Sequence, residues 1–497
     1  LIAPGVRPYL KSYKELPTEI DPEKGLAINA RVTLEFYDDE NDTDVDVDPY
    51  LSQRSGIQGA FWKKLLARNK FYQRRQVIIK KGFQGMSEGD YQVGFKGVID
   101  SISGPANGVV KIIIKDMLKK ADAVDVPTAT KGKTTDNPLT SSATVINLDS
   151  TAEYTASGWV RIDEEIIQYT GKSGNQITGC TRGGFSTTAA QHSQGATVQQ
   201  CTVWQNQKPF DIINDILQNR VGIAALDIDI TGAQADQDKW LPGYAFTGVI
   251  SEPTKASELI AEICESSLAV IWWDNESQLI KFRVSTPAPP GTTVLSFNDV
   301  EHIIAGSTTV SRNEGKRASL VVVHFKKKAI GRDNEDGGYS AKVLEVDADK
   351  EGSNEYGERA IKKIYSRWII NDGEANHLAS RTLSLFREPP IKLGFSVELK
   401  DDDLKTGDLF RLTTDDILDA AGTPEERLYQ VLRKEPKEDN EIAFLVMDTR
   451  HSKRYGFIAP NGYPNYPSAT AQQKEYAFVG NANNKVNGGI EDGYYIW

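Results

Sequence analysis

Four side chains within one stretch are of the types that acid–base catalysis uses. Glu164 and Glu165 are adjacent, and Arg182 and His192 follow in a segment rich in Gly and Thr. A histidine beside carboxylates can exchange protons near neutral pH. The other interpretation is that His192 is a hydrogen-bonding loop residue, and its lone position in a polar turn favours that one. We therefore predict no catalytic residue here.

An acidic run has the composition of an ion site. Its alternating acids could bind calcium, but the glycine and the closing glutamate of an EF-hand loop are absent. A solvated acidic loop is the favoured interpretation. The acids are Asp42, Asp44, Asp46 and Asp48.

The cysteines give no sign of a metal centre or a disulfide scaffold. Cys180, Cys201 and Cys264 are unclustered, and they lack the Cys-x-x-Cys and Cys/His spacings of zinc sites. Phosphate-binding and hydrolase motifs such as the Walker loop, Gly-x-Ser-x-Gly and His-Glu-x-x-His are also missing. We predict no catalytic, cofactor-binding or metal-binding residues, and no cofactor.

A glycan hydrolase is the enzyme class that the composition allows. Trp62, Trp272 and Trp273 could stack on sugars, and the sequence has 69 acidic residues. Hydrolysis needs two carboxylates at a set separation, and nothing in the sequence pairs any two of them. Trp272 and Trp273 are neighbours on a predicted strand, so they point to opposite faces, and packing or a subunit contact is the favoured role for them.

The residues of the first group lie on a small β unit, Gly158 to Val198. An alternating strand is predicted from Trp159 to Tyr169, a turn at Gly171 to Asn175, and a returning strand from Gln176 to Cys180. Arg182, Gly183 and Gly184 then open a glycine-permitted bend.

This unit resembles a small β module that recurs in tail-tip and baseplate proteins of tailed bacteriophages. The resemblance lies in the order Glu-Glu-Ile-Ile-x-Tyr, a Gly turn, Ile-Thr-Gly-Cys, Thr-Arg-Gly, and then His, Gly and Val. We suspect a phage tail hub from it. Asp125 to Ala143 reads as a Thr/Ser/Pro-rich linker into the module.

Two regions on either side resemble the two barrels of tail hub proteins. Strands are predicted in the first at residues 26–36, 77–79, 91–99 and 109–114, with a short helix at Asp116. The second has a helix capped by Asp372 and stopped by Pro389-Pro390, a strand from Ile391 to Leu399, and three further strands.

An α/β domain is predicted between these regions. A helix starts at Pro209, a second helix is capped by Thr254, and a hairpin covers Ala269 to Val284. The predicted fold is therefore mainly β with α+β parts, and multidomain. The expected domains are a first barrel-like hub domain (1–125), the inserted module with its linker (126–204), the α/β domain (205–300), a second barrel-like hub domain (301–455) and a C-terminal extended arm (456–497).

Composition bounds the remaining possibilities. With 497 residues and 39% hydrophobic residues the chain can bury several cores. No run of about 18 apolar residues exists, so no membrane span is expected, and the first residues lack the apolar stretch of a signal peptide. A net charge of -11 gives no electrostatic reason to expect phosphate-backbone binding.

The resemblance implies a structural virion protein and no enzyme. It implies a baseplate or tail-tip hub that assembles as a homotrimer in the host cytoplasm, joins tail tube and distal tail proteins to central fibre or tip proteins, and lets genomic DNA pass without specific binding. The alternative is a tail protein that binds or hydrolyses glycans of the host surface, with the module as the candidate binding unit.

Overall fold

The computed structural model describes ten ranges of the chain and four short strands near its C-terminal end. The ranges are residues 9–22, 25–38, 61–83, 85–285, 294–312, 314–328, 330–352, 357–419, 421–437 and 440–449. The short strands are β27 (Ala477–Val479), β28 (Lys485–Val486), β29 (Glu491–Asp492) and β30 (Tyr494–Ile496). The predicted acidic loop after Asp38, the Pro-rich break after Val284 and most of the predicted C-terminal arm lie outside the described residues.

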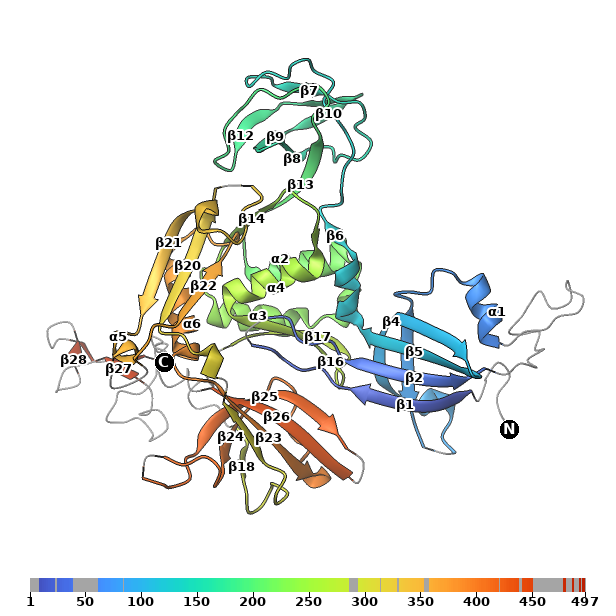
Figure 1. Ribbon diagram of the computed structural model, residues 1–497, viewed down its shortest axis with the longest axis vertical. Coiled ribbons are helices and arrows are strands. Elements are labelled where there is room, and N and C mark those ends of the chain that lie inside the picture. The colour runs from blue at the N-terminus through green and yellow to red at the C-terminus, as the bar shows by residue number, and fades with distance from the viewer. Residues whose placement is uncertain are drawn as a thin grey trace, which may run out of the picture.

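Figure 1 shows a central body that carries helices, one β-sheet beside it, a second sheet below it and a β module that projects above it. The chain is mainly β and multidomain, which confirms the predicted fold class. No helix within the described ranges is long and apolar enough to cross a membrane.

The first sheet is antiparallel, with the strand order β1-β2-β5-β4-β3. Alternating residues of β2 and β5 are buried against Trp62 and Phe95, as the period of a half-buried strand requires. The strands predicted around Val77, Tyr91 and Val109 are confirmed. The elements are β1 (Leu10–Leu16), β2 (Arg31–Tyr37), α1 (Phe61–Arg68), β3 (Gln76–Lys81), η2 (Glu88–Asp90), β4 (Gln92–Ala106), β5 (Val109–Asp116) and η3 (Met117–Ala123).

Residues 26–28, predicted as the start of strand β2, lie outside that strand and reach the central body, whereas Ala30 stays in the core of the first sheet. The amide of Ala30 donates to the carboxylate of Asp116 (2.7 Å), and the amide of Ala27 donates to Ile271 of the central body (3.1 Å). The short helix predicted at Asp116 is η3, and Asp116 caps it by accepting from the amide of Leu118 (3.0 Å).

The module has its own core, which includes Val160, Ile167 and Tyr169. Its strands are β7 (Val145–Asn147), β8 (Gly158–Ile162), β9 (Glu165–Tyr169), β10 (Gly171–Ser173), β11 (Gln176–Thr178), β12 (Thr181–Gly184) and β13 (Val198–Gln207). Most of the predicted linker before Ala143 packs on this core. Leu139 is buried there, and the hydroxyl of Thr130 donates to Val198 (2.8 Å). Side-chain hydrogen bonds hold this segment, so it shows no apolar period.

The central body combines helices with short sheets around one large core. The helix predicted to start at Pro209 is confirmed, whereas Lys255, not Thr254, is the N-cap of α4. Its elements are β6 (Asp125–Val126), α2 (Pro209–Asp215), the π-helix η4 (Ile216–Arg220), η5 (Ala225–Asp227), α3 (Ile230–Trp240), β14 (Phe246–Ile250), β15 (Thr254–Lys255), α4 (Ala256–Ser267), β16 (Ala269–Asp274) and β17 (Leu279–Val284).

A further segment, from Glu314 to Pro390, packs on the same core. Phe325, Trp368 and Phe386 are buried in it. The helix in this segment is capped by Asn371, which precedes the predicted cap Asp372, because the Asn371 side chain accepts from Gly373 (2.8 Å). The elements are η6 (Glu314–Lys316), β20 (Leu320–Lys327), η7 (Asp336–Gly338), β21 (Tyr339–Val346), α5 (Ala348–Glu351), β22 (Ile361–Tyr365) and α6 (Asp372–Phe386).

The second sheet has the strand order β18-β24-β25-β26-β23-β19. Only β18 and β24 are parallel neighbours in it. The faultless alternation predicted after Pro390 forms β23, whose buried residues meet Phe410 and Tyr429 in a separate core. The elements are β18 (Ser296–Asn298), β19 (Thr309–Arg312), β23 (Ile391–Glu398), η8 (Leu399–Asp401), β24 (Leu409–Thr413), β25 (Arg427–Pro436) and β26 (Glu441–Asp448).

Candidate functional site

The candidate acid–base group lies at a turn that the sequence did not reveal. The strand predicted from Trp159 to Tyr169 is two strands, β8 and β9, joined at Asp163 and Glu164. Asp163 has φ +52°, a left-handed conformation that Asp tolerates better than most residues. This turn leaves Glu164 exposed and buries Glu165.

Glu165 is the centre of a dense hydrogen-bond cluster. Arg182 donates to it with Nε (2.8 Å) and Nη2 (2.7 Å), and the amides of Gly183 (2.9 Å) and Ala190 (3.0 Å) also donate. The Nε2 atom of His192 lies 2.8 Å from the same carboxylate. Burial raises the pKa of Glu165, but the bonds from Arg182, Ala190, His192 and Gly183 outweigh it and lower the pKa to about 2.

His192 is buried between two carboxylates. Its Nδ1 lies 2.7 Å from Asp163 Oδ2, opposite the contact with Glu165. Carboxylate oxygens only accept, so both contacts are hydrogen bonds when the ring carries both protons. Neither ring nitrogen is open to a substrate. His192 is thus a hydrogen-bonding loop residue, as its sequence context favours.

The hydrogen bonds of the cluster stabilise the fold of the module and do not suit it for catalysis. A general acid needs a raised pKa, and that of Glu165 is lowered. The thiol of Cys180 is no ready nucleophile, because burial raises its pKa to about 11. Instead, Arg182 donates to the carbonyls of Thr140 and Ala190, so the cluster ties the 181–192 loop to β9. Glu164, which the sequence places beside these residues, takes no part.

The tryptophans that could stack on sugars are buried. Trp62 packs on Phe36 and Phe61, and its Nε1 donates to Tyr37 (3.2 Å). Trp272 and Trp273 enter two different cores on opposite faces of β16, as their adjacency predicted. Packing is therefore the role of all three. In the described part of the chain no three His, Cys, Asp or Glu side chains are placed to hold a metal ion.

The module joins the body through its last strand. One end of β13 pairs with β8 of the module, and the other end pairs with β14 of the body, where Val203 faces Val249. Trp204, on the same strand, is buried in the central core beside Trp368. A second link is the ion pair between Arg161 and Glu252. The predicted exit at Trp204 is thus inside a continuous strand.

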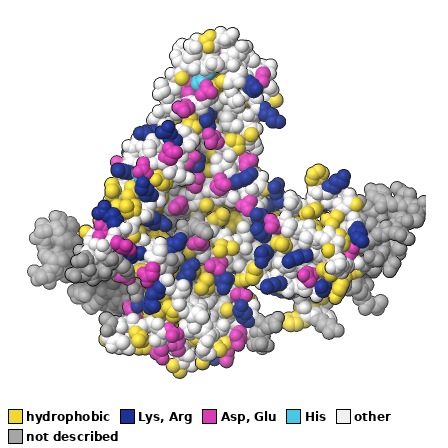
Figure 2. All heavy atoms as spheres, viewed as in Figure 1, with side chains coloured by type: hydrophobic (Ala, Val, Ile, Leu, Met, Phe, Trp, Pro, Cys, Tyr) yellow, Lys and Arg dark blue, Asp and Glu magenta, His cyan; other side chains and the backbone are white. Residues whose placement is uncertain are grey.

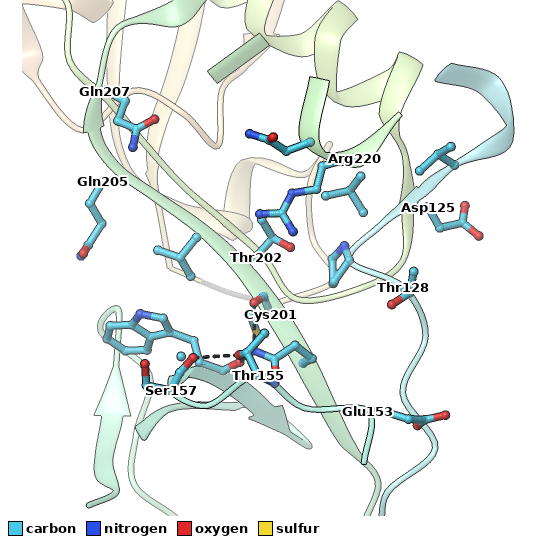
Figure 3. Close-up of a pocket in the computed structure, with 18 residues that line it drawn as sticks. Asp125, Thr128, Glu153, Thr155, Ser157, Cys201, Thr202, Gln205, Gln207 and Arg220 are labelled. Atoms are coloured by element: carbon cyan, nitrogen blue, oxygen red, sulfur yellow. Dashed lines mark hydrogen bonds between the residues drawn. The ribbon is translucent and has the colours of Figure 1, made fainter. Parts of the chain in front are cut away.

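A polar cleft of about 710 Å³ opens at this joint (Figure 3). Glu153, Thr155 and Ser157 line it from the module, and Thr202 and Arg220 line it from the body. Hydroxyl and amide groups dominate the lining, which suits neutral polar ligands better than apolar ones.

A second joint holds both sheets on the central body, and it is built by residues 18–22 and 25–28. The amide of Ile20 donates to Leu432 of the second sheet (2.9 Å), and the amide of Ile271 in the body donates to Gly25 (2.9 Å). Ile20 and Trp272 are buried in one small core with Leu432. The sequence signal was weak, because one isolated isoleucine between prolines shows no period.

Gly25 fits this joint because it has no side chain. Its φ is +71°, and a Cβ atom there would lie 2.5 Å from the Cβ of Cys264. The joint therefore fixes the first sheet, the body and the second sheet to one another through a close backbone contact.

Both large sheets end in strands that have a free edge within the described ranges. β1 and β3 bound the first sheet, and β18 and β19 bound the second. Every residue of β19 is exposed. Around β3 lie exposed Phe71 (88%) and Phe83 (82%), and Figure 2 shows hydrophobic side chains scattered over this part of the surface. Unpaired edges with apolar neighbours favour association with another chain.

Comparison with known proteins gives structural neighbours only. No protein-family model matches the sequence, and no curated protein matches it. Tail proteins of prophage MuSo2 from Shewanella oneidensis and of Neisseria meningitidis MC58 are each 10% identical, with a TM-score of 0.41, and each similarity covers 88% of this chain and 97% or 94% of the other. An E. coli component of the type VI secretion system, described as similar to the T4 tail proteins gp27 and gp5, is 9% identical with a TM-score of 0.35, over 93% of this chain and 79% of its own.

Proposed function

We propose that the chain is a structural protein of a bacteriophage tail, the hub of a baseplate or tail tip that connects the tail tube to the tip. The observation that carries this proposal is the joint at residues 18–22 and 25–28. It holds two separately cored β-sheets on one central body, and each sheet has free edges. The tail module resemblance of Gly158 to Val198 supports the same role.

The proposed assembly is a homotrimer around a channel. Three chains with two sheets each would offer six sheet units, which matches a tube built from six subunits. Closed rotational symmetry would also cover the free edges that a single chain leaves open. The proposed domain division, for the described residues, is 9–116 for the first sheet, 127–201 for the module, 117–126 with 202–285 and 314–390 for the body, and 294–312 with 391–449 for the second sheet.

The proposed partners are tail tube and distal tail proteins on one side and central fibre or tip proteins on the other. The protein would assemble in the host cytoplasm and remain in the virion. Genomic DNA would pass through the channel without specific binding, and the net charge of -11 supports a neutral to acidic lining. Tight, salt-sensitive duplex binding by the purified ring would contradict this lining. The proposed role is not enzymatic.

Electron microscopy of the purified protein tests the proposal, together with light scattering to measure its mass. We expect a threefold ring with a central channel, formed by the protein alone or beside tube protein. A monomer that persists at high concentration and forms no ring with tube protein would contradict the hub assignment.

The polar cleft favours one second candidate, glycan binding at the host surface. Its lining of hydroxyls and amides fits sugars, although the candidate tryptophans Trp62, Trp272 and Trp273 are buried elsewhere. Binding of the full chain to host envelope, weakened by Thr202→Val and accompanied by no release of reducing sugars, would support this candidate. Hydrolysis abolished by one carboxylate substitution would show an enzyme instead.

A further inference from the structure

A second cavity, of about 420 Å³, lies between the module and the body. Phe185, Ser186 and Thr187 form its module wall. The body wall comes from β14, from the end of β20 and from Arg367 and Ile370. Figure 2 shows Lys and Arg side chains gathered on the flank of the body just below the module. Its size is in the range of small-molecule sites.

The charge of this cavity has one sign. Among the described residues that line it, Lys326, Lys327, Lys328 and Arg367 are cationic and none is acidic. Three of these cations have ion-pair partners outside the lining: Lys326 with Asp372 (2.7 Å), Lys327 with Asp333, and Arg367 with Glu262 (2.9 Å). Lys328 makes no ion pair within the described ranges. Lys328 is thus the lining cation whose charge an anion bound in the cavity would neutralise.

The three lysines are consecutive, which a regular strand would not allow on one wall. Successive side chains of a strand point to opposite faces. Lys326 has φ +57°, its amide donates to Ile369 (3.0 Å), and the pairing of β20 with β21 runs from Phe325 to Lys327 without it. This local break in the strand accounts for lysines 326–328 lining the same cavity.

The opposite wall is also held in an unusual backbone conformation. Phe185 and Ser186 have φ +51° and +64°, in a two-residue turn where glycine or asparagine would cost less. Conformations of this kind cost of order 1 kcal/mol or more each and cluster at ligand-binding sites. Two strained segments, far apart in the sequence, therefore face each other across a cationic cavity.

Part of the lining is apolar. Ile166, Val249, Ile330 and Ile370 supply it. Arg367 binds Glu262 with both Nε and Nη2, and Lys326 and Lys327 are paired with acids, so within the described ranges Lys328 is the lining cation left for a ligand. Lysines act as point charges and bind phosphate without requiring a planar fork. Hydroxyls of Ser186 and Ser251 complete the lining.

We propose that this cavity binds a phosphate ester with an apolar substituent, held between the module and the body. The phosphate contacts Lys328 and the neighbouring lysines, and the apolar part lies on the isoleucines and Phe185. Because the ligand touches both walls, it also fixes the orientation of the module. The site is independent of the hub assembly.

Calorimetric titration of the full chain with phenyl phosphate tests this site. We expect saturable binding that is tighter than that of inorganic phosphate or benzyl alcohol. Lys328→Gln should weaken it about tenfold, since a charged hydrogen bond is lost, and Ile370→Asp should abolish it by repulsion. The matched control is Lys342→Gln, an exposed lysine of β21 outside the cavity, which should bind as the unaltered chain does.

Hydrogen exchange gives a second readout. Bound phenyl phosphate should slow amide exchange in residues 184–187 of the module. Vesicles of phosphatidic acid form a separate arm: displacement of phenyl phosphate by them would identify a lipid headgroup as the natural source, and no displacement would identify a soluble ester. The proposal is overturned if phenyl phosphate does not bind saturably, if inorganic phosphate binds equally well, or if Lys328→Gln and Ile370→Asp bind normally.

Discussion

Glu165 shows how a residue that looks catalytic in a sequence can be structural. Its carboxylate accepts from Arg182 and from two backbone amides, and it faces His192. Every one of these contacts closes the 181–192 loop, and none leaves an atom free for a substrate. The carboxylate of Glu165 is a buried charge with all its partners in place, and removing one partner would cost free energy of folding.

Glu165→Gln should destabilise the module by about 3 kcal/mol, because it leaves Arg182 buried without its counter-charge. The matched control is Glu164→Gln, one residue earlier but exposed, which should change stability by less than about 0.5 kcal/mol. Hydrogen exchange at the amides of Gly183 and Ala190 reports the difference. Equal exchange in the two variants would show that the cluster does not hold the loop.

Acid should weaken the same cluster. The pKa of Glu165 is lowered from 4.5 to about 2, so its stabilising effect is present above pH 4.5 and is lost as the pH falls toward 2. The difference corresponds to about 3 kcal/mol. Exchange of the loop amides, followed from pH 5 to pH 2.5, should accelerate relative to the module core. Glu165→Gln should lose most of this pH dependence.

The joint between the sheets depends on the absence of a side chain at Gly25. Gly25→Ala should cost about 3 kcal/mol, because the new methyl group meets the Cβ of Cys264 and the backbone is left-handed. Gly243→Ala is the control: Gly243 has φ +80° but open space around it, so only the backbone cost of about 1 kcal/mol applies. Thermal unfolding measures both. A Gly25→Ala variant as stable as Gly243→Ala would mean that the contact can relax.

At the scale of elements, periodicity predicted well where one face of an element is buried. Apolar residues repeat after Pro209 and alternate in strand β23, so the start of the helix and nearly the observed bounds of the strand were predicted. Prediction failed where turns or side-chain hydrogen bonds, not a buried face, fix the backbone. The turn at Asp163 interrupts an apolar alternation that continues on both sides of it. Residues 130–139 are held by side-chain hydrogen bonds, which leave no period in the sequence. The sequence predicted part of the Glu165 cluster. It grouped Glu165 with Arg182 and His192, but it did not distinguish the exposed Glu164 from the buried Glu165.

The pairing of strand β13 determines where a deletion of the module should end. Thr202, Val203 and Trp204 pair with β14, and Trp204 Nε1 donates to Asp215 (2.9 Å), so these residues belong to the body. Replacement of residues 130–200 by a Gly/Ser linker should therefore leave a soluble body with unchanged self-association. Extending the deletion through Trp204 should reduce solubility, since it opens the central core. Gel filtration separates the two results, and an insoluble product from the shorter deletion would make the module part of the core.

At the scale of the whole molecule, the arrangement supports the proposed assembly role, which requires no catalytic motif. Two β-sheets are fixed to one body by the joint and by contacts such as the ion pair between Lys96 and Asp227. The module is linked to the body by the chain after β6, by β13 and by the ion pair between Arg161 and Glu252 (Figure 1). A fixed distance between two sheet units lets a closed ring form from identical copies, because each contact repeats around the axis. The ring itself is a proposal, and substitutions on the edge strands of the sheets test it.

Ile78→Lys should prevent ring assembly and leave the fold intact. Ile78 is half exposed (51%) on β3, an edge strand of the first sheet, and a lysine on an edge discourages pairing with another chain. The matched control is Leu344→Lys on β21, which is also an edge strand and equally exposed (53%) but belongs to the central body. Light scattering should find monomers for Ile78→Lys and rings for Leu344→Lys, while circular dichroism finds both folded. If both variants assemble, β3 does not form the contact, and β19, which is exposed along its whole length, becomes the next edge to alter.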